Sequence, residues 1–429
     1  SYLVFDEAHS YQGEHSVIGL TYTILQRVLK WASLAGLTSI VMTATLPHTV
    51  KHYLFKYVEE RGKLRELKDL RPPLRRSINY SPLFKDNQTI YHLIKSDDFL
   101  KKVKEHQKTL LVLNTVGKAI DVFLKLKPII RKLGIEPMLI HSRMTASARA
   151  ERESELAKMR EDTGYNKLVV STQVAESGLD VSFDLLITEL APPEALVQRS
   201  GRCARRGGNG ELLIVQPAGE YYYQPYQKEL IDCTKDALKK FDIDFSSSFD
   251  LQLFIDDVYE KVPAELLTTS DSSVIDEVLS YFSVWTNPLL WPPPQYLQVR
   301  EGVPVTLCHL PDEELSVLLN GKEAEHTGEV VKKIIQRCFT LDFDILKRRR
   351  EIVEHDIDGS KILAGFTIYS QKELEEGRPI KLVAKVERIK SLNSMLTKNY
   401  GLLINPRYYK IEDSYELGLL LTRSAENKQ

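Results

Sequence analysis

Two arginines near the middle of the chain have the type and spacing to act on a phosphate group. Arg202 and Arg205 lie in the run Q-R-S-G-R-C-A-R at positions 198–205. We expect a helix from about Glu194 to Cys203 to carry them at i and i+3, so that they share one face. Two guanidiniums on one face can contact a phosphate whose negative charge grows during transfer.

An acidic pair follows the first apolar run of the chain. Residues 2–5 (Y-L-V-F) have the pattern of a strand buried on both faces of a parallel sheet, and Asp6-Glu7-Ala8-His9 comes directly after them. Open α/β sheets place their chemistry at this end of a strand. One carboxylate there can hold Mg²⁺, usually through water, and its neighbour can orient an attacking water. The alternative is a pair of acids that starts a helix, where the helix dipole favours negative charge.

Apolar strands alternate with amphipathic helices through the first half of the chain. The expected strands are 40–42, 109–113, 138–141, 167–172, 185–190 and 212–216, and the expected helices are 17–31, 118–133 and 146–160. This alternation predicts an α/β fold with parallel, doubly wound sheets. Within the helix over 146–160, Arg149, Arg152 and Lys158 fit a solvated face better than a phosphate-contacting track.

Length and composition limit the class of protein. A chain of 429 residues is too long for one ordinary core, and about two to four domains are expected. A net charge of −1 means that any nucleic-acid binding must come from a local basic track. The four cysteines show no C-x-x-C spacing, which argues against a zinc site and fits a reducing, cytoplasmic setting. No apolar run reaches the roughly 18 residues of a membrane span, so no membrane partner is expected.

Five motifs occur in a fixed order along the chain: D-E-A-H-S-Y, M-T-A-T-L-P, I-H-S-R-M-T, S-T-Q-V-A-E-S-G-L-D-V-S-F-D and T-E-L-A-P-P-E-A-L-V-Q-R-S-G-R. This ordered set resembles superfamily 2 helicases, and its wording is similar to the large CRISPR-associated helicase of type I systems. The match covers about residues 1 to 217. The resemblance implies two RecA-like lobes that close on ATP and move along single-stranded DNA. It also implies a type I CRISPR surveillance complex with guide RNA as a partner.

The resemblance assigns a role to each motif residue. Asp6 would associate with Mg²⁺, Glu7 would orient the hydrolytic water, and Arg202 and Arg205 would contact the phosphates of ATP. The residues that would line the nucleotide edge of the second lobe are Gly178, Asp180 and Gln198. Those that would couple the nucleotide state to the other lobe are His9, Thr43 and Thr45.

The DNA backbone would be held by a further set of polar residues, as positioning contacts to phosphate. This set comprises Thr115, Ser142, Arg143, Thr172 and Gln173. For the first three, ordinary loop polarity is an equal alternative.

One motif of the family is missing. No segment of the chain reads G-x-x-x-x-G-K-[ST], the loop whose backbone amides and lysine cradle phosphates. The nearest segment, N-T-V-G-K-A at 114–119, has Val112 where the first glycine belongs and Ala119 where the hydroxyl belongs, so we interpret it as a strand-to-helix turn. We therefore expect a C-terminal piece, inactive alone, that pairs with a missing N-terminal half of the first lobe.

A nuclease is the second part of this machinery that we expect outside the present chain. Many members of the family have an HD-type nuclease domain or subunit, yet His355-Asp356 is the only His-Asp dipeptide in this chain. Its acidic neighbours predict a solvated turn there. An HD-type nuclease is therefore expected as a separate domain or subunit.

The sequence divides into four expected regions. They are 1–79 (the C-terminal part of the first RecA-like lobe), 80–219 (the second lobe), 220–295 (a linker with helices) and 296–429 (a small, β-rich accessory domain). Tyrosines 221, 222, 223 and 226 fit a packed linker better than a base-stacking platform. The basic run 347–350 fits a DNA or partner contact and a solvent-facing turn equally well. Two alternative functions stay open: another superfamily 2 helicase, and a non-catalytic DNA- or protein-binding module.

Overall fold

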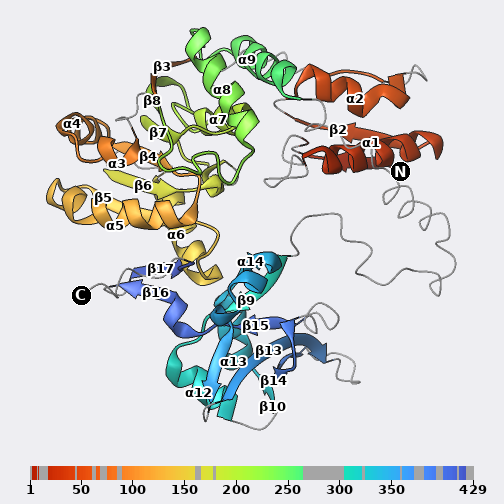
Figure 1. Ribbon diagram of the computed structural model, residues 1–429, viewed down its shortest axis with the longest axis vertical. Helices are drawn as coiled ribbons and strands as arrows, with labels where there is room; N and C mark the ends of the chain where they lie inside the picture. Colours follow the sequence, from red (N-terminus) through yellow and green to blue (C-terminus); the bar gives the residue numbers. More distant parts are fainter. Residues whose placement is uncertain are drawn as a thin grey trace. The chain divides into compact units, whose positions relative to one another are not determined.

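The computed structural model of the chain consists of two compact units (Figure 1). Unit 1 comprises residues 1–115, 122–137 and 159–301, and unit 2 comprises 116–121, 138–158 and 302–429. The residues that the structure describes are 2–6, 8, 18–43, 46–59, 64–67, 75–84, 89–159, 166–176, 180–263, 304–320, 324–357, 360–371, 381–392, 400–412 and 415–421. The expected connector around 285–294 lies outside them.

The part of unit 1 from β1 to α2, which we call the first-lobe segment after the expected first lobe, is a parallel strand pair with two helices packed beside it (Figure 1). Its elements are β1 (Tyr2–Phe5), α1 (Ile18–Leu34), β2 (Thr38–Val41) and α2 (His48–Glu59). The helices contribute Tyr22, Leu25, Leu29, Val50 and Leu54 to one buried cluster. Spacings of three and four residues place these side chains on one stripe of each helix, which is why the two helices pack against each other.

The strand pair is apolar on both of its faces. Phe5 and Val41 pack against the helical cluster, whereas Tyr2, Val4 and Ile40 point the other way and are 72%, 58% and 42% exposed. Parallel strands are normally covered on both faces. The face formed by Tyr2, Val4 and Ile40, which we call the open face, is therefore an exposed apolar surface.

A six-stranded sheet follows, in the order β3-β8-β7-β4-β6-β5. Its strands are β3 (Arg76–Leu83), β4 (Lys108–Val112), β5 (Glu136–Ile140), β6 (Lys167–Ser171), β7 (Leu185–Glu189) and β8 (Gly208–Val215). The β3–β8, β8–β7, β7–β4 and β4–β6 pairs are all parallel. Every residue of β6 and β7 is buried, as their continuous apolar runs require. The α/β fold class is confirmed, but β3 was not predicted.

Helices connect and flank these strands. They are α3 (Ile90–Leu93), α4 (Asp97–Glu105), α5 (Val116–Lys132), α6 (Ala146–Met159) and α7 (Pro193–Ser200), followed by α8 (Lys228–Lys240) and α9 (Ser248–Lys261). The turn between β4 and α5 confirms that 114–119 is a strand-to-helix connection. Within unit 1, α9 contacts both the first-lobe segment and α7: the His48 backbone N–H donates to Asp256 at 2.8 Å, and the Tyr259 hydroxyl donates to Glu194 at 2.9 Å.

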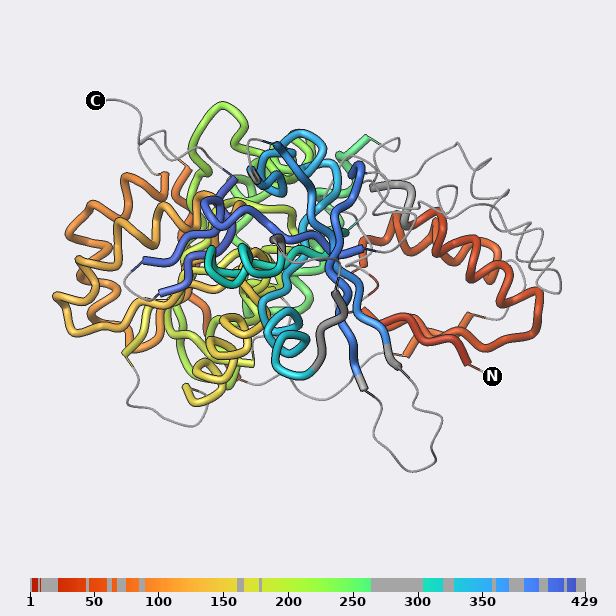
Figure 2. Tube along the Cα trace, turned by 90° about the horizontal axis from the view of Figure 1, so that it is seen from below, coloured from red at the N-terminus to blue at the C-terminus, as the bar shows by residue number. Residues whose placement is uncertain are grey.

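The distal part of unit 2 is a mainly antiparallel sheet in the order β10-β14-β13-β15-β9-β11, with β12 paired to β13. Its strands are β9 (Pro304–Cys308), β10 (Ala324–Thr327), β11 (Cys338–Asp342), β12 (Glu354–Ile357), β13 (Ser360–Gln371), β14 (Lys381–Ile389) and β15 (Gly401–Leu403). Its helices are α12 (Asp312–Asn320), α13 (Glu329–Gln336) and α14 (Phe343–Arg348). Figure 2 shows β13 and β14 running side by side. A separate hairpin, β16 (Tyr409–Glu412) and β17 (Tyr415–Leu419), ends the described chain.

Two expectations for the distal region can be compared with the structure. His355 does not lie in a solvated turn, because it is buried on β12 and its Nε2 lies 3.0 Å from the Leu403 carbonyl oxygen; that prediction was wrong. Strand pairing with β13 buries the imidazole, and this burial lowers its pKa. In the basic run, Lys347 on α14 pairs with Asp344, and Arg350 pairs with Glu354.

Candidate functional site

The arginine motif forms a turn after α7, and we call residues 201–206 the arginine turn. The predicted end of this helix, at about Cys203, is wrong, because α7 ends at Ser200. Phe183 donates its backbone N–H to the Arg202 carbonyl, and its own carbonyl accepts from Ala204 N–H, both at 2.9 Å. Ala204 has a φ of 47°. This pairing with a distant segment draws the backbone out of the helix, so Arg202 and Arg205 do not share a helix face.

Both arginines nevertheless reach the loop that follows β6. Arg202 is partly buried; its Nε donates to the Ala175 carbonyl at 3.0 Å, and its Nη2 donates to the Glu176 carbonyl. Arg205 is exposed, and its Nε lies 3.1 Å from Asp180 Oδ1. The structure thus brings Arg205 to Asp180, and Arg202 to the backbone of residues 175 and 176. Gln198 lies partly buried on α7, and Gly178 lies outside the described residues.

A third arginine of the motif was missed by the sequence analysis. Arg199 is fully buried, and its guanidinium forms an ion pair with Glu176 at 2.7 Å. Its other hydrogen-bond acceptors, at 2.8 to 3.2 Å, are Thr188 Oγ1, Tyr226 OH, Asn114 Oδ1 and the Glu189 carbonyl. Burial works to lower the pKa of Arg199, but Tyr226 and Glu176 outweigh it, so the pKa is raised overall. The five N–H groups of a guanidinium suit such a site.

The expected DNA-contacting residues of β4 and β6 lie at the edge of this buried network. Thr172 is buried, and Thr115 is partly buried after β4. Gln173 donates its side-chain amide to the Asn114 carbonyl at 2.9 Å and to the Tyr226 hydroxyl at 3.2 Å. Tyr226 therefore packs against the lobe, as expected for the tyrosine-rich linker. Hydrogen bonds connect Gln173 to Arg199 through Tyr226.

Ser142 and Arg143 follow β5 and belong to unit 2. Ser142 is exposed, whereas Arg143 is partly buried, and burial lowers its pKa to about 10. The backbone carbonyl of Arg143 accepts a hydrogen bond from Leu419 N–H at 3.0 Å. Arg143 is thus supported by the hairpin of β16 and β17.

In the first-lobe segment, the ends of β1 and β2 lie beside each other. Met42 N–H donates to the Phe5 carbonyl at 2.8 Å, and Ala8 N–H donates to the Met42 carbonyl at 3.0 Å. Asp6 is exposed and Thr43 is partly buried at these two strand ends. The remaining expected residues, Glu7, His9 and Thr45, lie outside the described part of the chain. Among the described residues, no group of three or more His, Cys, Asp or Glu side chains could hold a metal ion.

A titratable carboxyl group on α7 was also missed. Burial raises the pKa of Glu194 to about 7, although the Tyr259 hydroxyl donates a hydrogen bond to it. Burial and the same carboxyl group raise the pKa of Tyr22 on α1. Glu194 therefore interacts with residues of α1 and α9 within unit 1. It lies within the fifth motif, but the sequence analysis gave it no role.

Comparison with known proteins gives three concordant results. Residues 105–208 match the family model described as "CRISPR-associated nuclease/helicase Cas3, C-terminal". A putative CRISPR-associated nuclease/helicase Cas3 of Methanocaldococcus jannaschii is 29% identical over 318 residues, which cover 67% of this chain and 38% of that protein. The CRISPR-associated helicase Cas3 of Thermoproteus tenax is 26% identical over 313 residues, with coverage of 72% and 50%. The chain thus spans half or less of the length of these relatives.

Solved structures show the same fold. The crystal structure of T. fusca Cas3 with AMPPNP superposes with a TM-score of 0.57 at 20% identity, covering 79% of this chain and 47% of that chain. A chain in the structure titled "CRISPR RNA-guided surveillance complex, pre-nicking" gives a TM-score of 0.53 at 18% identity, with coverage of 79% and 49%. Among the described residues, no helix has both the length and the hydrophobicity to cross a membrane. The family model, the relatives and the shared fold confirm the resemblance inferred from the motifs: this chain is similar to CRISPR-associated helicases of the Cas3 type.

Proposed function

We propose that this chain provides the second motor lobe and the accessory domain of an ATP-dependent DNA helicase of type I CRISPR interference. The observation that carries the proposal is the joining of Arg202 and Arg205 to one loop at the carboxyl ends of parallel strands. Open α/β sheets bind phosphate-containing ligands at this edge. Guanidiniums held there can stabilise the charge that develops on a transferring phosphoryl group.

On the nucleotide side, we assign one role each to Arg205, Asp6 and Glu7. Arg205 exchanges its Asp180 carboxylate for a phosphate of ATP, because it is exposed and its carboxylate partner is half-exposed. Asp6, at the end of β1, supplies a carboxylate oxygen suited to Mg²⁺, which would neutralise phosphate charge when bound. Glu7 orients the hydrolytic water.

The DNA side of the proposal uses the polar strand ends. Gln173 and Thr115 hold the backbone of single-stranded DNA near β4 and β6, and Ser142 and Arg143 hold it after β5. A net charge of −1 requires such local contacts, since the chain as a whole does not attract DNA. Because Gln173 and Arg199 share the Tyr226 hydroxyl, a change on the nucleotide side is transmitted through hydrogen bonds to the DNA side.

The proposed partners follow from the same family. The relative from M. jannaschii is named a nuclease/helicase, and one structural neighbour comes from a guide-RNA surveillance complex. We therefore propose that the complete helicase acts with an HD-type nuclease and is recruited by such a complex. This chain provides the movement along DNA and the nuclease provides the cleavage.

The test is ATP hydrolysis by the complete helicase, with and without single-stranded DNA. Arg202→Ala or Glu7→Gln should abolish turnover and leave DNA binding largely intact. Arg206→Ala is the matched control, because Arg206 is exposed in the same turn but lies outside the motif. Normal turnover in Arg202→Ala or Glu7→Gln would contradict the role of that residue. Equal stimulation by RNA would favour a different superfamily 2 function.

Reconstitution gives an independent test. ATP turnover is measured for this chain alone, and again after adding a polypeptide that carries the phosphate-binding loop. Turnover only in the mixture would support the proposal. No turnover in either sample, with DNA binding retained, would favour the non-catalytic binding module.

A further inference from the structure

The segment after β5 contacts the last hairpin of the described residues. We call residues 141–145 the strand loop and β16 with β17 the terminal hairpin. Both belong to unit 2, although more than two hundred residues separate them in sequence. The strand loop carries Ser142 and Arg143, two of the residues expected to contact DNA.

Backbone contacts fix the first half of the strand loop. Leu419 N–H donates to the Arg143 carbonyl at 3.0 Å, and His141 Nε2 lies 2.9 Å from the Leu417 carbonyl. Arg143 N–H lies 3.1 Å from His141 Nδ1. Nδ1 must therefore accept and Nε2 must donate, which requires a neutral imidazole. Burial lowers the pKa of His141 to about 3, so the imidazole stays neutral at physiological pH.

Side chains of the hairpin fix the second half of the loop. Thr145 N–H donates to the Tyr409 hydroxyl at 2.8 Å, and the Thr145 hydroxyl donates to Glu416 at 2.6 Å. Tyr409 in turn donates its hydroxyl proton to Glu416. Because Thr145 precedes the first residue of α6 and accepts from Ala148 N–H at 3.3 Å, the hairpin also fixes the start of that helix.

A buried arginine on α6 extends the contact. Arg152 is only 6% exposed, so the expected solvated face is wrong at this position. Its guanidinium carbon lies 4.3 Å from the centre of the Tyr415 ring, a cation–π contact. Tyr415 also accepts the backbone N–H of Leu139 on β5 at 2.8 Å. The hairpin therefore contacts the strand before the loop, the loop itself and the helix after it.

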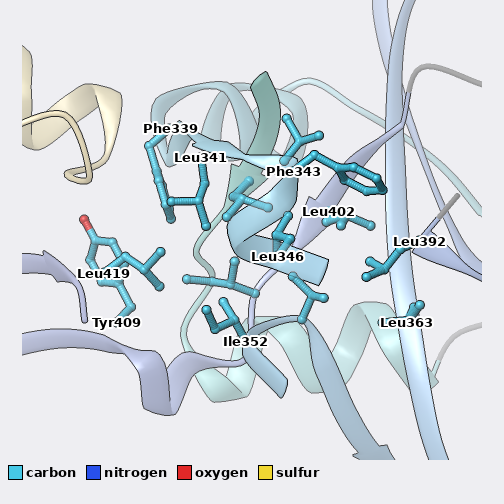
Figure 3. Packing of buried hydrophobic residues seen from close by; sticks show 14 residues of the cluster. Phe339, Leu341, Phe343, Leu346, Ile352, Leu363, Leu392, Leu402, Tyr409 and Leu419 are labelled. Carbon is cyan, nitrogen blue, oxygen red and sulfur yellow. The ribbon is translucent and has the colours of Figure 1, made fainter. Parts of the chain in front are cut away.

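The terminal hairpin is itself anchored in the accessory core. Tyr409 and Leu419 belong to the cluster that contains Phe339, Leu346 and Leu402 (Figure 3). In Figure 3 the Tyr409 hydroxyl points away from this cluster. The Tyr409 ring stacks on His309 at 4.2 Å between ring centres. The residues that hold the strand loop are thus fixed by the packing of the accessory sheet.

Gly418 allows the hairpin to approach this closely. Its φ of 89° is a conformation that side-chain-bearing residues rarely adopt, and an added Cβ would lie 2.6 Å from the Arg143 carbonyl oxygen and 2.7 Å from His141 Cε1. The first is a backbone atom, and the second belongs to a buried imidazole ring that two hydrogen bonds hold in place. A side chain at position 418 must therefore displace the strand loop or the hairpin.

We propose that the terminal hairpin is a positioning element for DNA, through which the accessory domain sets the strand loop in the conformation that presents Ser142 and Arg143 to the DNA backbone. This inference rests on the proposed DNA-translocase function. It gives the accessory domain a specific role, since the loop that grips DNA is built by residues of the motor lobe and is held by residues of the accessory domain.

The test compares Gly418→Ala with Gly328→Ala in the complete helicase. Gly328 also has a positive φ, 63°, but an added Cβ there meets nothing within 4 Å, so this control has the backbone strain without the collision. Gly418→Ala should raise the single-stranded DNA concentration for half-maximal ATPase stimulation about tenfold, equivalent to about 1.4 kcal/mol of DNA binding. The rate without DNA should be unchanged. Gly328→Ala should match the wild type.

A second variant covers the case in which Gly418→Ala fails to fold. Tyr409→Phe keeps the ring in the accessory core but removes the hydroxyl that accepts from Thr145 and donates to Glu416. It should also raise the DNA concentration required and speed amide exchange at Thr145. Unchanged DNA dependence in a folded Gly418→Ala or Tyr409→Phe variant would overturn the inference. A wild-type ATPase that does not respond to DNA would instead overturn the proposed function.

Discussion

The buried histidine of the strand loop makes the stability of unit 2 depend on pH. His141 is 0% exposed, and its pKa falls from 6.5 to about 3 because burial disfavours the imidazolium. The neighbouring Arg143 and Arg152 lower it further, whereas the Leu417 carbonyl acts in the opposite direction. Between about pH 3 and pH 6.5, His141 is therefore mainly neutral in the folded state and mainly protonated in the unfolded state.

The size of the effect follows from these two pKa values. A base with a lowered folded pKa contributes stability above its unfolded pKa, and this stability is lost as the pH falls toward the folded pKa. At pH 5 the unfolded state is almost fully protonated at His141 and the folded state is not, which lowers the free energy of unfolding by about 2 kcal/mol relative to pH 7. The result changes little if the folded pKa is about 4, because both values lie below pH 5.

The assay is urea-induced unfolding of unit 2 at pH 7 and pH 5, for the natural chain and for His141→Asn. The asparagine side-chain oxygen can still accept Arg143 N–H, but it does not titrate. The natural chain should lose about 2 kcal/mol more than the variant between the two pH values. His309 and His355, whose pKa values burial also lowers, are present in both chains and cancel. Equal losses would refute the inference that His141 is held neutral.

Two further substitutions test buried groups of unit 1. Arg199→Lys keeps the charge but loses the planar guanidinium that reaches both Glu176 and Tyr226. We expect the free energy of unfolding, measured with denaturant, to fall by about 2–4 kcal/mol. A change as small as that caused by replacing a surface arginine would contradict this expectation. Glu194→Gln removes a carboxyl group whose pKa is raised from 4.5 to about 7. Because the folded state resists losing this proton, the natural chain loses stability as the pH rises from 4.5 through 7. The melting temperature of the variant relative to the natural chain should therefore rise between pH 5 and pH 8, and parallel pH curves would exclude this role.

The α/β core was predictable because its strands have only one plausible environment. Each of β6 and β7 contains a continuous apolar run, residues 168–170 and 185–187, and a parallel strand covered on both faces accommodates such a run. β3 was missed because its sequence, R-S-I-N-Y-S-P-L, mixes polar residues with Pro82. Proline is tolerated mainly at sheet edges, which is where β3 lies.

The site was predictable in its residue types but not in its geometry. Arg199, Arg202 and Arg205 look alike in the sequence, yet they are fully buried, partly buried and exposed. What separates them is the pairing of the arginine turn with Phe183, a contact between segments distant in the chain. The one local signal was Glu176, an acid that lies between Ala175 and Ser177 and could have marked a partner for Arg199.

The open face of β1 and β2 links the folding of the first-lobe segment to association. Val4 and Ile40 are 58% and 42% exposed, so covering each would add roughly half of the ~1.5–3 kcal/mol that full burial of such a side chain contributes. Any polypeptide that covers this face therefore adds directly to the folding free energy of the segment, and the amount depends on the concentration of that polypeptide. The melting temperature of this segment would then depend on the concentration of that polypeptide as well as on the sequence of the segment. Folding of this segment and binding of any such polypeptide would be thermodynamically coupled.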